Sequence, residues 1–305
     1  MLEYIPLVVS VVALGGYLVA GAHLRRRGDS WPAARTWCMV SGTACVAAAV
    51  LPPVGKHDEL FPLHIVQHLL IGMAGPGLLA LSAPITLTLR SLPAPSRGVL
   101  LRVLHGRTVG VISSPVAALS VDIGGLYVLY LTGLYGVMER HELLHAVVHL
   151  HMFMAGCLLS WVLVGVDPVR RRSVTVKVVT LAVVGAAHDT LSKLMYAHDL
   201  PNDAGTIFQR HLGAEVMYYG DTAIGLALAV VVMTQWWRAT GRSLTRAARR
   251  RRTGLGPVAH RGASCPPTRQ DQQEGPSRSH QTPCPLWAQS LDARRPLPTG
   301  VIEGL

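Results

Sequence analysis

Long apolar stretches separated by short polar segments are the dominant pattern along this chain. An α-helix needs about 20 mostly apolar residues to cross a bilayer. Seven stretches have roughly that length, at residues 4–22, 36–54, 63–89, 114–136, 142–165, 174–198 and 214–237. Half of the 305 residues are hydrophobic and only 15% are charged, as expected for a lipid-embedded protein. The sequence therefore predicts an all-α fold, a polytopic membrane protein built as a seven-transmembrane-helix bundle.

The basic residues alternate between the predicted loops. Twelve of them lie after the first, third and fifth apolar stretches, whereas the other three loops contain one each, Lys56, Arg140 and Arg210. Cytoplasmic loops of membrane proteins carry the excess of lysine and arginine. We therefore predict that residues 1–240 form a transmembrane domain whose N-terminus lies outside and whose C-terminus is cytoplasmic. The first stretch follows Glu3 and has no basic residue before it, which favours a retained helix over a cleaved signal peptide.

The C-terminal part differs in composition from the rest of the chain. Residues 238–305 contain 12 arginines and 4 acidic side chains, hence +8 of the formal net charge of +11. Residues 241–305 are predicted to be a basic, disordered cytoplasmic tail, because they are rich in Pro, Gly, Ser and Gln and poor in apolar side chains. The arginines at 246 and 249–252 follow the last span, where anionic lipid head groups attract them. Lipid is the expected partner of this charge, and nucleic acid is not.

The five cysteines indicate neither a disulfide framework nor a thiolate metal clamp. Cys38 and Cys45 lie in the second stretch, Cys157 lies in the fifth, and Cys265 and Cys284 lie in the tail. No CxxC pair occurs, and small buried apolar residues are the simpler interpretation.

Histidines in the apolar stretches are the main candidates for chemistry. An imidazole inside a bilayer marks a ligand site, a proton path or a buried polar pairing. Residues four apart share one face of a helix, and several histidines follow this spacing. Under the predicted topology all of them lie in the outer half of the membrane. The candidate metal ligands are His64 and His68 in the third stretch, His141, His145 and His149 in the fifth, and His188 in the sixth.

Other side chains near these histidines are candidates for accessory roles. Imidazole suits copper, zinc, iron and nickel, and thioether sulfur selects Cu(I), so copper is the expected cofactor. Carboxylates can hold a ligating ring in one tautomer. Each accessory candidate could instead have a purely structural role, such as packing. Asp189 could form an ion pair with Lys193. Asp122 in the fourth stretch needs a partner from another helix. The accessory candidates are Met152, Asp189, Met195, Glu215, Met217 and Asp221.

Several of these segments together resemble the bacterial caa3-type cytochrome c oxidase assembly factor family. The third stretch has His64-Ile-Val-Gln-His68 followed by Pro76 and Ala83-Pro84, and the fifth ends in the motif at 165–168, Gly-Val-Asp-Pro. Leu212-Gly213, Gly220-Asp221 and Gln235-Trp236 are similar to the family's last helix. The resemblance covers roughly residues 4–240. It implies a role in maturing a haem–copper oxidase, with copper supply to an oxidase subunit as the expected step.

The sequence thus predicts a non-enzymatic assembly factor of the plasma membrane that binds or delivers copper through histidines near its outer face. Two alternatives remain open. Paired histidines on two helices can ligate haem iron, which predicts an integral membrane b-type haem protein that moves electrons. A zinc ion held by histidines, with Asp189 or Asp221 activating water, would make an intramembrane hydrolase.

Overall fold

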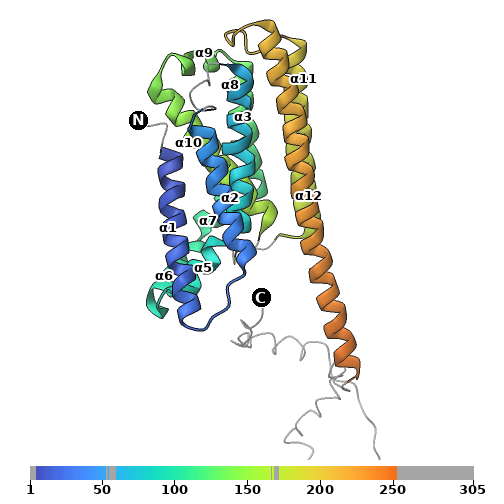
Figure 1. The fold of residues 1–305 in the computed structure, drawn as a ribbon. Coiled ribbons are helices and arrows are strands. Elements are labelled where there is room, and N and C mark those ends of the chain that lie inside the picture. The colour runs from blue at the N-terminus through green and yellow to red at the C-terminus, as the bar shows by residue number, and fades with distance from the viewer. Residues whose placement is uncertain (1–4, 53, 55–59, 166, 168–171, 253–305) are drawn as a thin grey trace, which may run out of the picture. The chain divides into compact units, whose positions relative to one another are not determined.

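Every regular secondary-structure element in the described part of the chain is a helix. A computed structural model describes residues 5–52, 54, 60–165, 167 and 172–252, and no strand occurs in these segments. The predicted disordered tail beyond Arg252 lies outside them. Figure 1 shows the arrangement. The helices are α1 (Ile5–Arg26), α2 (Ala33–Val50), α3 (Phe61–His68), the π-helix η3 (Leu69–Ala74), α4 (Gly75–Leu81), α5 (Pro84–Ser91), α6 (Ala94–Leu104), α7 (Arg107–Ile112), α8 (Pro115–Leu131), α9 (Leu134–Glu139), α10 (Glu142–Val164), α11 (Val174–Ala197) and α12 (Ile207–Arg252).

The predicted membrane spans correspond to these helices. Within the described residues, six helices are long and apolar enough to cross a bilayer. The pair α8 and α9, bent by 81° at the break between them, provides a seventh span if it is counted as one. This confirms the all-α polytopic fold. The third span, Phe61–Ser91, combines α3, η3, α4 and α5.

The last helix is longer than the apolar stretch predicted it to be. The hydrophobic pattern placed the seventh span at 214–237, but α12 runs from Ile207 to Arg252. It therefore enters the segment from residue 241 that was predicted as disordered. Arginine has a high helix propensity, so a basic segment can continue a helix after its apolar part has ended. By its internal contacts the chain divides into two units, 1–241 and 242–305, and the first six spans and the apolar part of α12 belong to the first.

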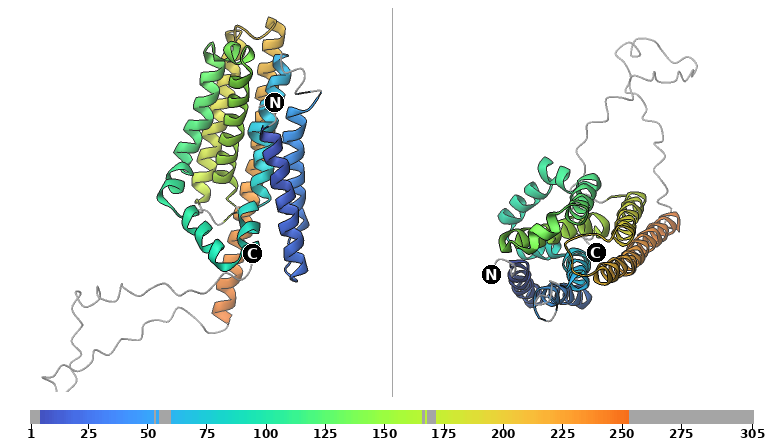
Figure 2. Two further views of the ribbon diagram at one scale, coloured as in Figure 1. Left: turned by 90° about the vertical axis from the view of Figure 1, so that its left-hand side faces the viewer. Right: turned by 90° about the horizontal axis from the view of Figure 1, so that it is seen from above.

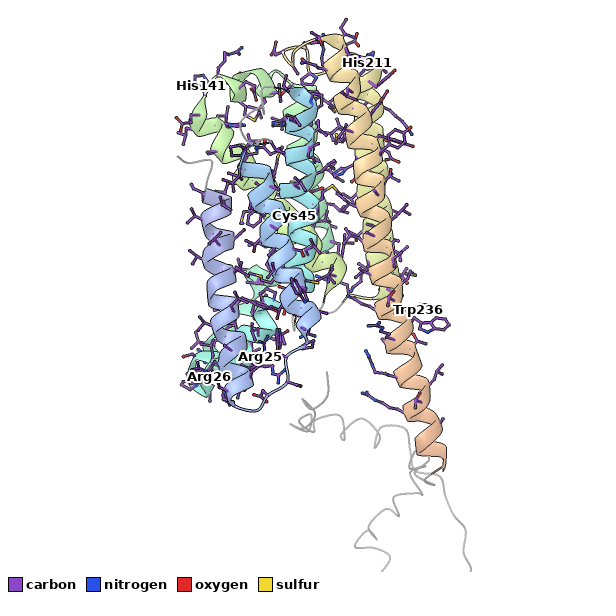
Figure 3. The ribbon with its side chains drawn as sticks, in the orientation of Figure 1. Arg25, Arg26, Cys45, His141, His211 and Trp236 are labelled. Carbon is purple, nitrogen blue, oxygen red and sulfur yellow. The ribbon has the colours of Figure 1, made fainter. Side chains whose placement is uncertain are left out.

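The basic loops meet at one end of the bundle. Arg90, at the end of α5, forms an ion pair with Asp29 in the loop after α1, with a nitrogen–oxygen distance of 3.5 Å. Arg172, before α11, donates a hydrogen bond to the carbonyl of Ser113, before α8. Figure 3 shows Arg25 and Arg26 at this end, whereas His141 and His211 lie at the other. The alternation of charge along the sequence thus corresponds to a separation in space, and the N-outside orientation stays a prediction.

The third span is irregular at the positions where proline and glycine interrupt its pattern. The π-helical turn η3 begins directly after His68, and α4 follows with Pro76 in its first turn. Because proline has no N–H group, it cannot continue the α-helical ladder behind it. A second break occurs at Ala83, whose φ of 53° is left-handed, before Pro84 starts α5. π-helical turns are frequent at functional sites, and this one borders a histidine.

The centre of the bundle is α10, which contacts α1, η3, α4, α8, α9 and α11; Figure 2 shows the bundle from the side and from above. A Cβ atom placed on Gly156 of α10 would collide with the backbone carbonyl of Gly72 in η3. The two backbones can approach this closely only because Gly156 has no side chain; a Cβ atom on Gly72 would instead contact the ring of His68 at 3.3 Å. This contact fixes α10 against the third span, and these two elements carry most of the predicted ligands.

Asp167 anchors the segment after α10. Its carboxylate is buried, with 1% of the side chain exposed. It accepts hydrogen bonds from the backbone N–H and the hydroxyl of Thr86 and from the indole N–H of Trp161. A buried carboxylate is stable only when its oxygens are satisfied in this way. The aspartate in the motif after the fifth span is therefore a structural residue that ties the end of α10 to α5.

Candidate metal centre

Three buried histidines from two helices converge at the core of the candidate site. His64 projects from α3, and His145 and His149 project from successive turns of α10. One nitrogen from each ring can be chosen so that all three lie within 4.8 Å of one another. The ring centroids of His145 and His149 are 4.3 Å apart, and that of His64 lies 5.9 Å from His149. We call these three residues the histidine triad.

The nitrogens of the triad are unusual for buried polar atoms. Among the described residues, both ring nitrogens of His64 and the Nε2 atom of His149 have no hydrogen-bond partner. A buried polar atom without a partner costs about 1–3 kcal/mol. Such atoms are unfavourable in an apolar core, but a site that binds a metal needs nitrogens that are free to act as ligands. Three ligands at about 2.0 Å from one ion lie about 3.5 Å apart, so small ring rotations from the present spacing would close the triad around a metal.

Aromatic rings pack around His64, which is fully buried. Tyr135 and Tyr130 meet the imidazole edge-on at 5.2 and 6.2 Å between centroids, and Phe61 packs on both tyrosines in the same manner. These rings exclude lipid and water from the triad. Sequence reasoning missed both tyrosines, because an aromatic residue in an apolar stretch looks like any packing residue. Their position just before the triad's helix α10, near the break between α8 and α9, was the only available signal.

A second buried polar cluster lies beside His68. The Nδ1 atom of His188 on α11 is 2.9 Å from Oδ1 of Asp221 on α12, and its Nε2 atom is 3.2 Å from Oδ2 of Asp122 on α8. The ring of His68 lies 6.3 Å from the ring of His188. All four side chains are buried. Asp122 thus has the partner from another helix that its position in the fourth stretch required.

The other predicted residues are distributed differently. His141 precedes α10 and is exposed, so the structure does not bring it to the triad; His188 joins the second cluster instead. Asp189 is half-buried and Glu215 is exposed, and Lys193 lies over the ring of Tyr218. The three predicted methionines are buried in the main apolar core, a placement that packing explains: Met152, Met195 and Met217.

The donor set of the triad is compatible with a metal that prefers imidazole. Copper, zinc, iron and nickel all accept such ligands. The triad consists of neutral donors in an apolar and aromatic surrounding. A site of this kind can hold an ion by imidazole nitrogen alone.

The fold and these clusters define a class of protein: a multi-spanning helical membrane protein with a histidine cluster buried between its third and fifth spans. The sequence pattern of the cytochrome c oxidase caa3 assembly factor family matches residues 15–239. The chain belongs to this family.

Curated relatives extend the comparison to mycobacteria. Uncharacterized proteins of Mycobacterium bovis and Mycobacterium tuberculosis are each 29% identical over 257 residues, and one of Mycobacterium leprae is 26% identical over 253. The matches cover 77%, 77% and 75% of this chain but only 39%, 39% and 38% of the relatives. The chain thus spans about two-fifths of their length. No solved structure matches it.

Proposed function

We propose that the protein assists assembly of a cytochrome c oxidase by carrying copper, as cargo, on the histidine triad. The observation that carries this proposal is the convergence of His64, His145 and His149, whose ligand atoms lie within 4.8 Å of one another in a buried site. Membership of the family supports the assembly role. The partner is a haem–copper oxidase subunit that receives the ion, and the protein itself performs no catalysis.

The chemistry of transfer supports histidine as the donor. A carrier must bind its ion and release it, and imidazoles of similar affinity exchange more readily than a closed thiolate cage. His145 and His149 follow His141 by about one and two turns of α10, and Figure 3 shows His141 at the end of the bundle opposite Arg25 and Arg26. The triad therefore lies toward the His141 end. In the N-outside orientation, this position brings the site near the non-cytoplasmic face of the plasma membrane, the side from which copper would be supplied.

The surroundings of the triad favour copper carriage over the two alternatives. A haem ligated by His64 would need space for its macrocycle beside the ring, and Tyr130, Tyr135 and Phe61 pack there. A zinc hydrolase could use the HExxH sequence at 141–145, but His141 and Glu142 are exposed at the start of α10 and only His145 of this motif belongs to the triad. Of the carboxylates predicted to activate water, Asp221 is instead engaged by His188.

The test is copper content of the purified full chain. We expect the detergent-solubilised protein to retain Cu(I) after desalting, and the double variant His64→Ala/His149→Ala to lose at least one equivalent. The matched control is His198→Ala, which removes an exposed imidazole at the end of α11. In cells lacking the protein, the wild type should restore oxidase activity and the double variant should not. A wild type that retains no copper, together with a double variant that restores full oxidase activity, would refute the proposal.

A further inference from the structure

The arginine-rich end of the bundle contains a polar cavity that the copper proposal does not use. Its volume is about 380 Å³, within the range of about 300–1,000 Å³ that ligand clefts have. It lies where the end of α1 meets the turn between α5 and α6. Within the described segments, three guanidinium groups and one imidazole line it and no acidic side chain does. We call this space the arginine cavity, after Arg27, Arg90 and Arg97, which line it together with His23.

Most of the positive charge in the arginine cavity has no counter-charge. Arg90 forms an ion pair with Asp29, with a nitrogen–oxygen distance of 3.5 Å. Arg27 and Arg97 form no ion pair with any residue that the structure describes. A guanidinium group stays protonated in proteins. Three arginines and one acidic partner therefore leave two positive charges at the cavity, which attract an anion into it.

We propose that the arginine cavity binds the phosphate group of an anionic phospholipid. The planar guanidinium group matches the geometry of two phosphate oxygens, and its hydrogen bonds to them are strengthened by charge. The start of α6 contributes in the same sense, because a helix N-terminus favours an anion. No side chain caps this terminus and no acidic residue occupies its first turn, and Ala94 of that turn lines the cavity. The inference is independent of the copper proposal.

Arg90 provides the fixed part of this site. Its guanidinium group lies 5.8 Å from the ring centroid of Trp31 and donates a hydrogen bond to the carbonyl of Ser30, besides its ion pair with Asp29. An arginine has five N–H donors, so these contacts leave donors for a phosphate oxygen. Arg27 and Arg97 are exposed, and their long side chains can turn toward the phosphate, one from the end of α1 and one from α6.

The surroundings of the cavity favour a lipid over a free phosphate ion. Neither α6 nor α7 has a buried residue, although both connect membrane spans. Their sequences combine arginines with apolar side chains that are more than half exposed, at Val99, Val103, Val111 and Ile112. Helices of this composition lie in the membrane interface, with their apolar side chains against acyl chains. A phospholipid whose phosphate occupies the cavity can cover these side chains with its acyl chains, and a phosphate ion cannot.

Lipid binding by the purified full chain tests the cavity. The protein is delipidated in detergent and offered phosphatidylglycerol against an excess of phosphatidylcholine, and bound lipid is counted by native mass spectrometry. We expect the wild type to retain one phosphatidylglycerol per chain. The double variant Arg27→Ala/Arg97→Ala should bind it about 10- to 30-fold more weakly, because it lacks two arginines that attract an anionic head group. Both side chains are exposed, so the unfolding temperature should not change.

The matched control removes the same charge outside the cavity. Arg102→Ala/Arg107→Ala takes two exposed arginines from α6 and α7 that do not line it, and this variant should retain the lipid. Equal losses in the two double variants would overturn the site, because overall charge would then explain the binding. A wild type that does not prefer phosphatidylglycerol to phosphatidylcholine would overturn it as well. If inorganic phosphate displaces phosphatidylglycerol at equal concentration, the cavity takes a free phosphate ion and the lipid assignment is wrong.

Discussion

Nδ1 of His188 lies 2.9 Å from Oδ1 of Asp221, and this contact joins α11 to α12 inside the bundle. Few other polar contacts connect these helices within the described residues. The longest helix among the described residues is therefore held to its neighbour partly through a buried hydrogen bond. Such a contact stabilises a fold only while both partners are present.

Removing Asp221 should destabilise the bundle strongly. In Asp221→Ala the Nδ1 atom of His188 stays buried without a partner, and loss of one member of a buried pair costs about 3–5 kcal/mol. The measurement is thermal or denaturant unfolding in detergent, followed by tryptophan fluorescence. Asp189→Ala is the control, since the half-buried neighbour of His188 should change stability by no more than about 1 kcal/mol. Equal effects of the two substitutions would contradict the buried contact.

Gly156 should tolerate no side chain. A Cβ atom at this position would collide with the carbonyl oxygen of Gly72, so Gly156→Ala should push α10 away from η3 and lower stability by about 1–3 kcal/mol. Gly185→Ala on α11 is the matched control, because no atom lies within 4 Å of its added Cβ and alanine favours a helix by up to about 1 kcal/mol. We expect the unfolding midpoint to fall in Gly156→Ala and not in Gly185→Ala. If both midpoints shift in the same direction, the close approach of α10 to η3 is disproved.

Asp167 should be required for the connection after α10. Asp167→Ala leaves the backbone N–H of Thr86 and the indole of Trp161 without their acceptor, and each unsatisfied buried donor costs about 1–3 kcal/mol. We expect a lower unfolding temperature and faster proteolytic cleavage between the fifth and sixth spans. Asp29→Ala removes an exposed ion pair with Arg90, which contributes at most about 1 kcal/mol, and should leave both measurements nearly unchanged.

The sequence predicted the spans because the bilayer sets both their length and their composition. Each of the seven apolar stretches contains or overlaps a described span. It did not predict where α12 ends, because the apolar pattern stops at residue 237 while backbone hydrogen bonding continues to Arg252. The apolar pattern at 114–136 also does not show the bend in the fourth span, although Thr132-Gly133 is a local signal for the break between α8 and α9.

The candidate site was predictable only as a set of positions along helices. Spacing placed His145 and His149 on one face of α10, and the structure has them adjacent to each other. Spacing does not state which helices are neighbours, so it could not separate His188, which pairs with Asp122 and Asp221, from the triad. Nor could it show that His141 is exposed, because a helix N-terminus at the membrane edge has the same sequence pattern as one inside it.

The membrane orientation can be tested with single cysteines. In a background without the five native cysteines, Asn202→Cys lies in the exposed loop between α11 and α12, and Gly98→Cys lies on exposed α6 between the third and fourth spans. With the arginine-rich end in the cytoplasm, an impermeant maleimide added to intact cells should label position 202 and not 98. Labelling of 98 alone would reverse the topology and place the triad toward the cytoplasm.

Tyr130 should contribute its ring, and not its hydroxyl, to the stability of the metal-free protein. The residue is fully buried, and its hydroxyl has no hydrogen-bond partner within the described segments. Tyr130→Phe therefore removes an unsatisfied buried group and should leave the unfolding temperature unchanged or raise it. Tyr130→Ala should lose about 3–5 kcal/mol through the cavity it creates, since the ring packs edge-on against both His64 and His68.

Copper per chain in Tyr130→Phe should equal that of the wild type if only nitrogens and carboxylates bind the ion. A phenylalanine variant that folds as well as the wild type but binds less copper would assign the hydroxyl to the metal site.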